Sequence, residues 1–337
     1  MLNCLGAFVV AIALALVISP LVFKVLRKLK TGQNILEYVD NHKSKQGTLT
    51  MGGLIFVFAM WVAFIFFAGN YVLASLTLII TACYSLLGFL DDYIKIRLKH
   101  NEGLKPYQKI IGQVGIASIV AVFVYFFSTL GGNVMLSYTN ISFNISYFII
   151  PFLIIFFIAV TNSVNLTDGL DGLAGYNSLI VILTLGVVAV VKHFALVDDT
   201  GIYSMASEYI NIAVVCFAMT GALMVFLLFN CHPAKIFMGD TGSLALGGFI
   251  ASVSVFLQEP LLLLTLGITF VTSSVSDIIQ VSYYKLTKQR IFLMAPFHHH
   301  LERVGLKETK IVGIYTFVTL MISIITILIY IYKGLII

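Results

Sequence analysis

Two carboxylates stand close together in the stretch NSVNLTDGLDGLAG (162–175), which lies between two apolar runs. Asp168 and Asp171 are three residues apart, a spacing that places both on one face if the segment is helical. The neighbouring Asn and Gly residues equally suit a loop whose backbone approaches a ligand. Acidic groups beside long apolar runs cost free energy, so they indicate a functional role; the alternative is that they cap helices.

A second pair of acids, Asp91 and Asp92, lies in GFLDDYIK (88–95) at the end of another apolar run. Adjacent carboxylates repel each other, so they need a nearby cation or a raised pKa. A hydrated Mg²⁺ bound by carboxylates and phosphate oxygens would meet this need. The alternative is an acidic loop start whose charge is neutralised by Lys95 and Arg97.

Asp240 and a run of histidines add further reactive groups. Asp240 lies in NCHPAKIFMGDTGS (230–243) at the head of an apolar run, where it is either a metal ligand or a helix cap. Three histidines follow one another on an expected irregular loop in APFHHHLE (295–302): His298, His299 and His300. They can bind a transition metal, donate to phosphates or shuttle protons, and the alternative is a solvated polar loop.

The stretch KSKQGTLTMGG (43–53) places lysines beside Gly and Thr, a combination that suits phosphate oxygens. It lacks the order of glycines, lysine and Ser/Thr that defines a P-loop, so ATP hydrolysis is not indicated.

The elements that must position these residues are membrane helices. Sixty per cent of the 337 residues are hydrophobic and ten per cent are charged, which excludes a soluble domain. We therefore expect an all-α polytopic membrane protein, with residues 1–337 forming a single domain and no nucleic-acid-binding motif. The four cysteines lack metal-ligand spacing and are interpreted as small buried hydrophobes without a disulfide framework.

Ten apolar segments are close to the roughly 20 residues that a membrane helix needs. They span residues 3–23, 50–69, 71–90, 110–130, 147–164, 176–192, 209–229, 241–257, 261–284 and 311–332. The first segment is followed, not preceded, by its cations, which is the reverse of a secretory signal peptide. We therefore expect an uncleaved first helix with its N-terminus outside.

The cations fix the expected orientation. All of the 20 Lys and Arg residues except Lys192 and Lys333 fall in loops on one side of these ten spans. The positive-inside rule makes that side cytoplasmic and both termini external. Every cluster of reactive residues then faces the cytoplasm. On the other side, the uncharged residues 131–146 alternate well enough for a small extracytoplasmic hairpin around Tyr138-Thr139-Asn140.

Together the clusters can hold a divalent cation and a polyphosphate while apolar grooves hold a lipid. Phosphoryl transfer chiefly needs such positioning and charge neutralisation, so we expect a membrane-embedded enzyme acting on phosphorylated substrates. An ion-coupled transporter is the rival interpretation, and Asp277 inside the ninth span would suit it. Transporters place their acids near the bilayer midplane and often repeat their halves, whereas these acids cluster at one interface without a repeat.

Several long motifs occur in the order found in one family: GTLTMGG (47–53), GFLDDYIK, NLTDGLDGLA, FMGDTGSLALGG and APFHHHLE. On these motifs the chain resembles the polyprenyl-phosphate N-acetylhexosamine-1-phosphate transferases over nearly its whole length. The triple histidine resembles the motif of the family branch that uses a muramoyl-pentapeptide substrate, and not the branches that use UDP-N-acetylglucosamine. Leu49 departs from the pattern, since the family usually has Pro there, and the turn is expected to be looser.

The resemblance implies transfer of phospho-N-acetylmuramoyl-pentapeptide from UDP-N-acetylmuramoyl-pentapeptide to undecaprenyl phosphate, a membrane lipid. The products are UMP and the first lipid-linked precursor of peptidoglycan. The resemblance also implies Mg²⁺ as cofactor, a homodimer, and a place in the bacterial plasma membrane. The in-family alternative is a UDP-N-acetylglucosamine-1-phosphate transferase serving another cell-wall polymer.

The resemblance further implies roles for individual residues. Asp91 and Asp92 match catalytic acids, with Asp91 the candidate base for the lipid phosphate, and Asp240 matches the Mg²⁺ ligand. The histidines match residues near the diphosphate and sugar, and Phe237 matches an aromatic that stacks on uracil. The remaining substrate-binding candidates are Lys45, Asn165, Asp168, Gly169, Leu170, Asp171 and Asn230. Direct attack by the lipid phosphate and a two-step route through an aspartyl enzyme both remain open, and we favour direct attack.

Overall fold

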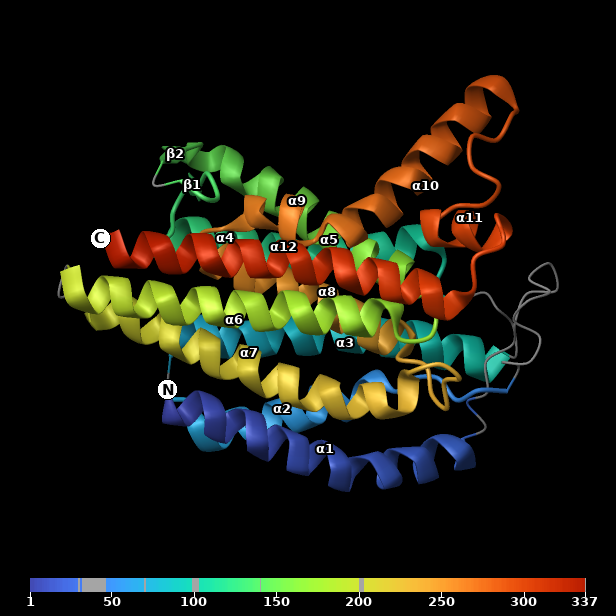
Figure 1. Cartoon of the computed structure of the whole chain (residues 1–337), viewed down its shortest axis with the longest axis horizontal. Helices are drawn as coiled ribbons and strands as arrows, with labels where there is room; N and C mark the ends of the chain where they lie inside the picture. Colours follow the sequence, from blue (N-terminus) through green and yellow to red (C-terminus); the bar gives the residue numbers. More distant parts are fainter. Residues whose placement is uncertain are drawn as a thin grey trace.

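The computed structural model describes residues 1–29, 31, 47–69, 71–98, 103–139, 141–199 and 203–336, and these are almost entirely helical (Figure 1). Lys45 therefore lies outside the described residues. The helices of the first half are α1 (Leu2–Lys28), α2 (Gly53–Phe67), α3 (Val72–Leu98), α4 (Pro106–Phe127), η2 (Ser146–Phe148) and α5 (Ile149–Thr167). Those of the second half are α6 (Leu173–Asp199), α7 (Tyr203–Asn230), α8 (Gly239–Phe256), η3 (Pro260–Leu262), α9 (Leu263–Leu266), α10 (Ile268–Thr287), α11 (Phe297–Arg303) and α12 (Glu308–Ile336).

The helices make this a multi-pass membrane protein. Among the described residues, seven helices are long and apolar enough to cross a membrane: α1, α3, α4, α5 together with η2, α6, α7 and α12. The pair η3–α9 and α10 makes an eighth if it counts as one span, although it bends by 85°. Each of the ten expected segments contains a helix. However, α2 has only 15 residues, so composition and length alone do not establish ten spans.

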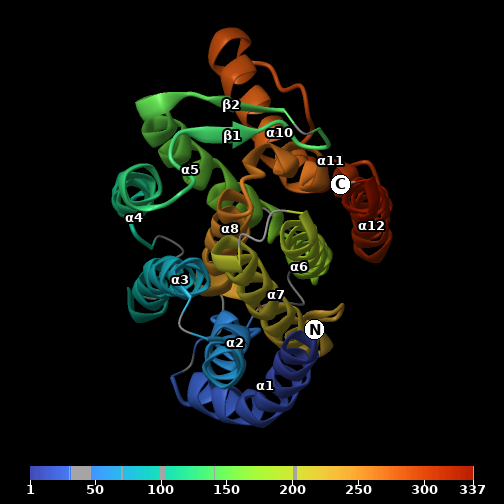
Figure 2. The same ribbon diagram turned by 90° about the vertical axis from the view of Figure 1, so that its left-hand side faces the viewer.

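Helix α8 forms the centre of the bundle, between α3 and α5 (Figure 2). Every residue from Thr241 to Phe256 is buried. Small residues let neighbouring backbones approach closely. A Cβ added to Gly53 would lie 2.3 Å from the Cα of Gly242, and one added to Gly248 would lie 2.5 Å from the Tyr84 ring. This packing fixes the first turn of α8, which carries Asp240.

A two-stranded antiparallel sheet lies within the segment expected to form a hairpin. Strand β1 (Asn133–Met135) pairs with β2 (Ser142–Asn144), with Val134 opposite Phe143. The turn between them is tied to α12, because Lys333 donates to the Thr139 carbonyl at 2.6 Å. Both chain termini lie at the same end of the molecule as this sheet, on the left in Figure 1 and towards the viewer in Figure 2.

Helix α10 leans away from the bundle and leads into α11 at the opposite end (Figure 1). The structure corrects two expectations about local structure, one for α11 and one for α3. The three histidines lie in the short helix α11 and not on an irregular loop. Helix α3 continues to Leu98, so Asp91 and Asp92 lie within a helix and not at the start of a loop. Asp277 is half-buried on α10.

Candidate active site

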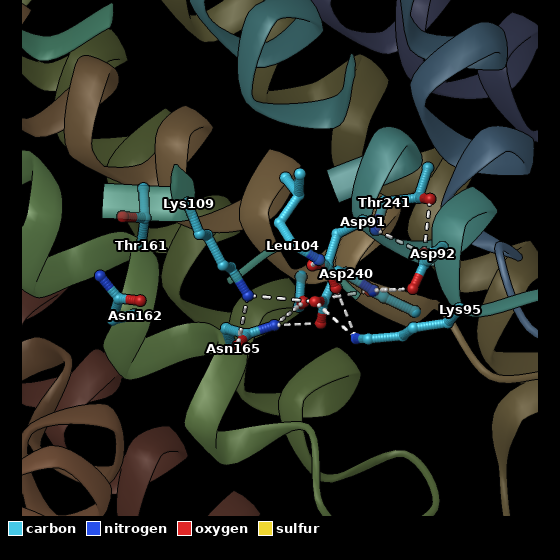
Figure 3. Close-up of polar contacts among 12 residues, drawn as sticks. Asp91, Asp92, Lys95, Leu104, Lys109, Thr161, Asn162, Asn165, Asp240 and Thr241 are labelled. Carbon is cyan, nitrogen blue, oxygen red and sulfur yellow. Dashed lines mark hydrogen bonds and ion pairs between the residues drawn. The ribbon is translucent and has the colours of Figure 1, made fainter. Parts of the chain in front are cut away.

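Three acids from two helices converge at one point (Figure 3). Asp91 and Asp92 of α3 meet Asp240 in the first turn of α8, and one oxygen of each lies within 4.8 Å of the others. Gly88 makes the meeting possible. A Cβ at this position would lie 2.0 Å from the Asp240 carbonyl oxygen, so only glycine allows α3 and α8 to cross this closely.

Asp92 is buried and serves as the cap of α8. Its carboxylate accepts hydrogen bonds from the Asp240 N–H at 3.2 Å, the Thr241 N–H at 2.9 Å and the Thr241 hydroxyl at 2.7 Å. A negative charge there is stabilised by the free N–H groups and the dipole of the helix. Asp240 makes no such capping bond to its own helix, so the capping interpretation raised for Asp240 applies instead to Asp92.

Two lysines balance the charge of the acids. Asp240 Oδ2 accepts from Lys95 and Lys109, each with its Nζ at 3.0 Å. Lys95 also lies 2.5 Å from Asp91 Oδ2, and Asp91 Oδ1 accepts from the Leu104 N–H at 2.7 Å. Of the two cations expected to neutralise the acidic pair, Lys95 does so, whereas Arg97 is exposed at the end of α3. The sequence alone indicates no role for Lys109 beyond that of a cation in a loop.

Asn165 of α5 completes the surroundings of Asp240. Its amide nitrogen donates to Asp240 Oδ1 and to the Ser243 hydroxyl, both at 2.7 Å, and its oxygen accepts from Lys109 at 3.3 Å. Asn165, a predicted substrate-binding residue, therefore lies beside the acids, and its hydrogen bond helps to hold the Asp240 carboxylate in one orientation.

Asp168 and Asp171 both lie on the loop between α5 and α6, which is the loop alternative of the sequence analysis and not one helical face. Helix α5 ends at Thr167, before both residues. Burial raises the pKa of Asp168 well above its usual range, and the negative charges of Asp240, Asp92 and Asp171 add to the effect. Asp171 accepts from the Ala234 N–H at 3.0 Å and belongs to a second group, with His232 and Glu308.

The segment before α8 pairs with the glycine-containing stretch that precedes α2. The Phe237 N–H donates to the Leu49 carbonyl at 2.8 Å, and the Gly52 N–H donates to the Phe237 carbonyl at 2.9 Å. Leu49 thus takes part in backbone pairing although it replaces the usual proline. The Phe237 side chain is partly exposed on this segment and is not buried inside a span.

Asn230, the last residue of α7, is buried beside the same segment. Its amide nitrogen donates to the Ile236 carbonyl at 2.9 Å. Its Oδ1 atom is buried and, among the described residues, has no hydrogen-bond partner. A buried acceptor without a donor is costly, so this atom is suited to a donor group on a ligand.

The three histidines face different surroundings. His298 is fully buried against the α5–α6 loop, where a Cβ on Gly169 would lie 2.4 Å from its Nε2. His299 Nδ1 lies 2.6 Å from Glu302, and His300 Nδ1 accepts from the Leu293 N–H at 3.2 Å. Within the described part of the chain, none of them belongs to a group of three metal-binding side chains, so nothing supports a shared transition-metal site.

Fold and site together define a multi-pass membrane protein with a buried cluster of acids and lysines. The family model described as "Glycosyl transferase family 4" matches residues 72–258. A phospho-N-acetylmuramoyl-pentapeptide-transferase of Clostridium perfringens (strain 13 / Type A) is 41% identical over 93% of this chain and 94% of its own length. One from Listeria welshimeri is 43% identical over 91% of this chain and 92% of its own length. One from Clostridium novyi is 40% identical over 94% of this chain and 93% of its own length.

The chain therefore belongs to glycosyl transferase family 4, and within it to the phospho-N-acetylmuramoyl-pentapeptide-transferases. It is a transferase, and the ion-coupled transporter interpretation is set aside.

Proposed function

We propose that the protein transfers phospho-N-acetylmuramoyl-pentapeptide from UDP-N-acetylmuramoyl-pentapeptide to undecaprenyl phosphate. The printed names of relatives about as long as this chain support the transferred group. The observation that carries the chemistry is the convergence of Asp91, Asp92 and Asp240 beside two lysines. Such a cluster suits phosphoryl transfer, which depends mainly on positioning and on neutralising charge.

The donor set of the cluster suits Mg²⁺. Three carboxylates with an oxygen each within 4.8 Å of one another are hard ligands of the kind this ion prefers. We assign Asp240 as the principal ligand, with Asp91 and Asp92 beside it. When bound, the ion would neutralise charge on the diphosphate. Lys95 and Lys109, which pair with Asp240 in the described structure, are close enough to share in balancing that charge.

Asp91 is the better candidate for a base than Asp92. Counting the described residues alone, Asp92 accepts from three donors of α8, whereas Asp91 accepts one backbone hydrogen bond and pairs with Lys95. Asp91 would take the proton of the lipid phosphate. A phosphate oxygen would then attack the sugar-bearing phosphorus of the diphosphate. The bond from that phosphorus to the bridging oxygen breaks, and UMP leaves with the electron pair.

The uridine end of the substrate is assigned to the residues around the α5–α6 and α7–α8 loops. We infer that Phe237 stacks on uracil and that Asn230 Oδ1 accepts from a donor on the ligand, because Phe237 is partly exposed and Asn230 Oδ1 has no hydrogen-bond partner within the described ranges. The other assigned contacts are Asn165, Asp168, Gly169, Leu170 and Asp171. The three histidines, His298, His299 and His300, are assigned to the diphosphate and sugar, with Lys45 on the nucleotide side.

The orientation is part of the same proposal. We place the acid cluster at the cytoplasmic face of the bacterial plasma membrane, with the hairpin and both termini outside, in a single domain with ten spans. The distribution of cations supports this orientation, because all but Lys192 and Lys333 belong to loops on one side of the predicted spans. A homodimer is the proposed assembly.

Substrate identity is tested by exchanging the nucleotide sugar. The purified protein in detergent should move label from UDP-N-acetylmuramoyl-pentapeptide, but not from UDP-N-acetylglucosamine, to undecaprenyl phosphate. Transfer from UDP-N-acetylglucosamine alone would assign the protein to the other branch of the family.

A further inference from the structure

The loop assigned to the nucleoside is held by a residue far away in the chain. The N–H of Asp171 donates to Oε1 of Glu308 at 2.7 Å, across 137 positions. Glu308 lies in the first turn of α12, and both side chains are largely buried. A hydrogen bond from a backbone N–H to a carboxylate is stronger than one between neutral groups. Glu308 therefore restrains the main chain at Asp171 directly.

His232 joins the same contact from the segment between α7 and α8. Its Nδ1 atom lies 3.1 Å from Asp171 Oδ2 and 3.4 Å from Glu308 Oε2. The same Asp171 oxygen accepts from the Ala234 N–H at 3.0 Å. Two neighbouring carboxylates repel each other unless a donor or cation lies between them, and His232 occupies that position.

Three separate parts of the chain consequently meet at this cluster. The α5–α6 loop carries Gly169 and Leu170, and the segment between α7 and α8 carries Phe237 and follows Asn230. These are the two sides of the uridine pocket proposed above. The start of α12 contributes no residue to that pocket, yet its Glu308 contacts both sides.

We propose that Glu308 and His232 are positioning residues that hold the two sides of the uridine pocket at the spacing needed for nucleotide binding. This inference rests on the proposed function. Glu308 acts through the main chain of Asp171, and His232 acts through its side chain. A carboxylate in the first turn of a helix also interacts favourably with the helix dipole. Glu308 could therefore serve only to stabilise α12, and a test must distinguish this role from the positioning of Asp171.

The test compares removal with conservative replacement at each position. Glu308→Ala should weaken UMP binding about tenfold, which corresponds to the free energy of one hydrogen bond to a charged group. Glu308→Gln should keep affinity within about threefold of the wild type, because its amide oxygen still accepts from Asp171. His232→Ala should lower affinity severalfold, and His232→Asn should restore most of it, since the Asn amide can donate near the Nδ1 position. Thr309→Ala, at an exposed neighbour on the same turn, is the matched control.

The measurements are isothermal titration with UMP and the KM of each substrate. We expect the KM for the UDP-sugar to rise in both alanine variants, while the KM for undecaprenyl phosphate stays unchanged. Alanine variants that bind UMP as tightly as Thr309→Ala, while the wild type binds and turns over, would overturn the inference. Equal losses in Glu308→Gln and Glu308→Ala would also overturn it, because the helix dipole responds to the charge alone. A wild type that neither binds UMP nor transfers label would instead refute the proposed function.

Discussion

Asp91 and Asp92 are neighbours in sequence but have different surroundings. Asp92 accepts three hydrogen bonds from the first turn of α8, whereas Asp91 accepts one from the Leu104 N–H and pairs with Lys95. The first arrangement holds the Asp92 carboxylate in one place and joins two helices. The second places an Asp91 oxygen beside the Lys95 ammonium group, which also pairs with Asp240. Asp92 can thus serve a structural role while its neighbour Asp91 serves a chemical one.

Lys109 allows a test of charge balance at a single residue. Its Nζ pairs with Asp240 at 3.0 Å, and its side chain is mostly buried. We expect Lys109→Gln to lower turnover at least about tenfold, since a partly buried hydrogen bond between charged groups is lost. Arg97→Gln removes the same charge from an exposed position at the end of α3 and should leave turnover within about twofold. Similar turnover in the two variants would remove Lys109 from the site.

Phe237 tests nucleotide recognition separately from chemistry. If its ring stacks on uracil, Phe237→Ala should lose about 1–3 kcal/mol of nucleotide binding. This corresponds to a loss of roughly 5- to 150-fold in affinity for UMP and for the UDP-sugar alike, because both carry the base. Phe237→Trp should retain much of the affinity. Titration with UMP decides the matter, and an unchanged affinity in the folded Ala variant would exclude Phe237 from the nucleotide site.

At the scale of elements, the crossing of α3 and α8 builds the site. The closest point is Gly88, where an added Cβ would meet the main chain of Asp240 at 2.0 Å. Neither helix can move along the other without changing the hydrogen bonds of Asp92 to Asp240 and Thr241. The geometry of the three acids therefore depends on a residue that contributes no functional group.

Gly88→Ala should consequently damage both stability and activity. Overpacking of this kind costs about 1–3 kcal/mol or more, and separating the helices also pulls Asp240 away from Asp91. The control is Gly115→Ala on α4, where an added Cβ meets nothing within 4 Å. That change should be neutral or stabilise the helix by about 0.5–1 kcal/mol. Thermal unfolding in detergent compares the two, and equal midpoints would contradict the close crossing.

The sequence motifs predict that Asp91, Asp92 and Asp240 lie on one face of the membrane, because each is at an end of an apolar run, and the three acids do meet. Other features depend on where a helix ends or how two helices pack, which a single sequence does not fix. Helix and loop were both open for Asp168 and Asp171, and they lie on a loop because α5 stops at Thr167. Lys109 resembled an ordinary loop cation, since its partner lies 131 positions away. Its spacing of four from Gln113, on the same face of α4, was the available signal.

At the scale of the whole molecule, the two ends of the bundle carry different elements. The sheet β1–β2 and both termini lie at one end, and α11 lies at the other (Figures 1 and 2). We expect single cysteines placed in 131–146 or 193–208 of a variant lacking the four native cysteines to react with an impermeant thiol reagent on intact cells. Cysteines placed in 99–105 or 303–308 should be protected. Labelling of the protected positions from outside would reverse the proposed orientation.

The central claim is that the three converging acids form a Mg²⁺-dependent centre for transfer of phospho-N-acetylmuramoyl-pentapeptide to undecaprenyl phosphate. The most direct measurement follows radiolabel transfer by the wild type and by Asp240→Asn, each with and without Mg²⁺. Asparagine keeps the volume and the acceptor for Asn165 but removes the charge. We predict labelled lipid only from the wild type with Mg²⁺, and a loss of about 100-fold or more in the folded variant. Near-normal, metal-independent transfer by Asp240→Asn would contradict the claim.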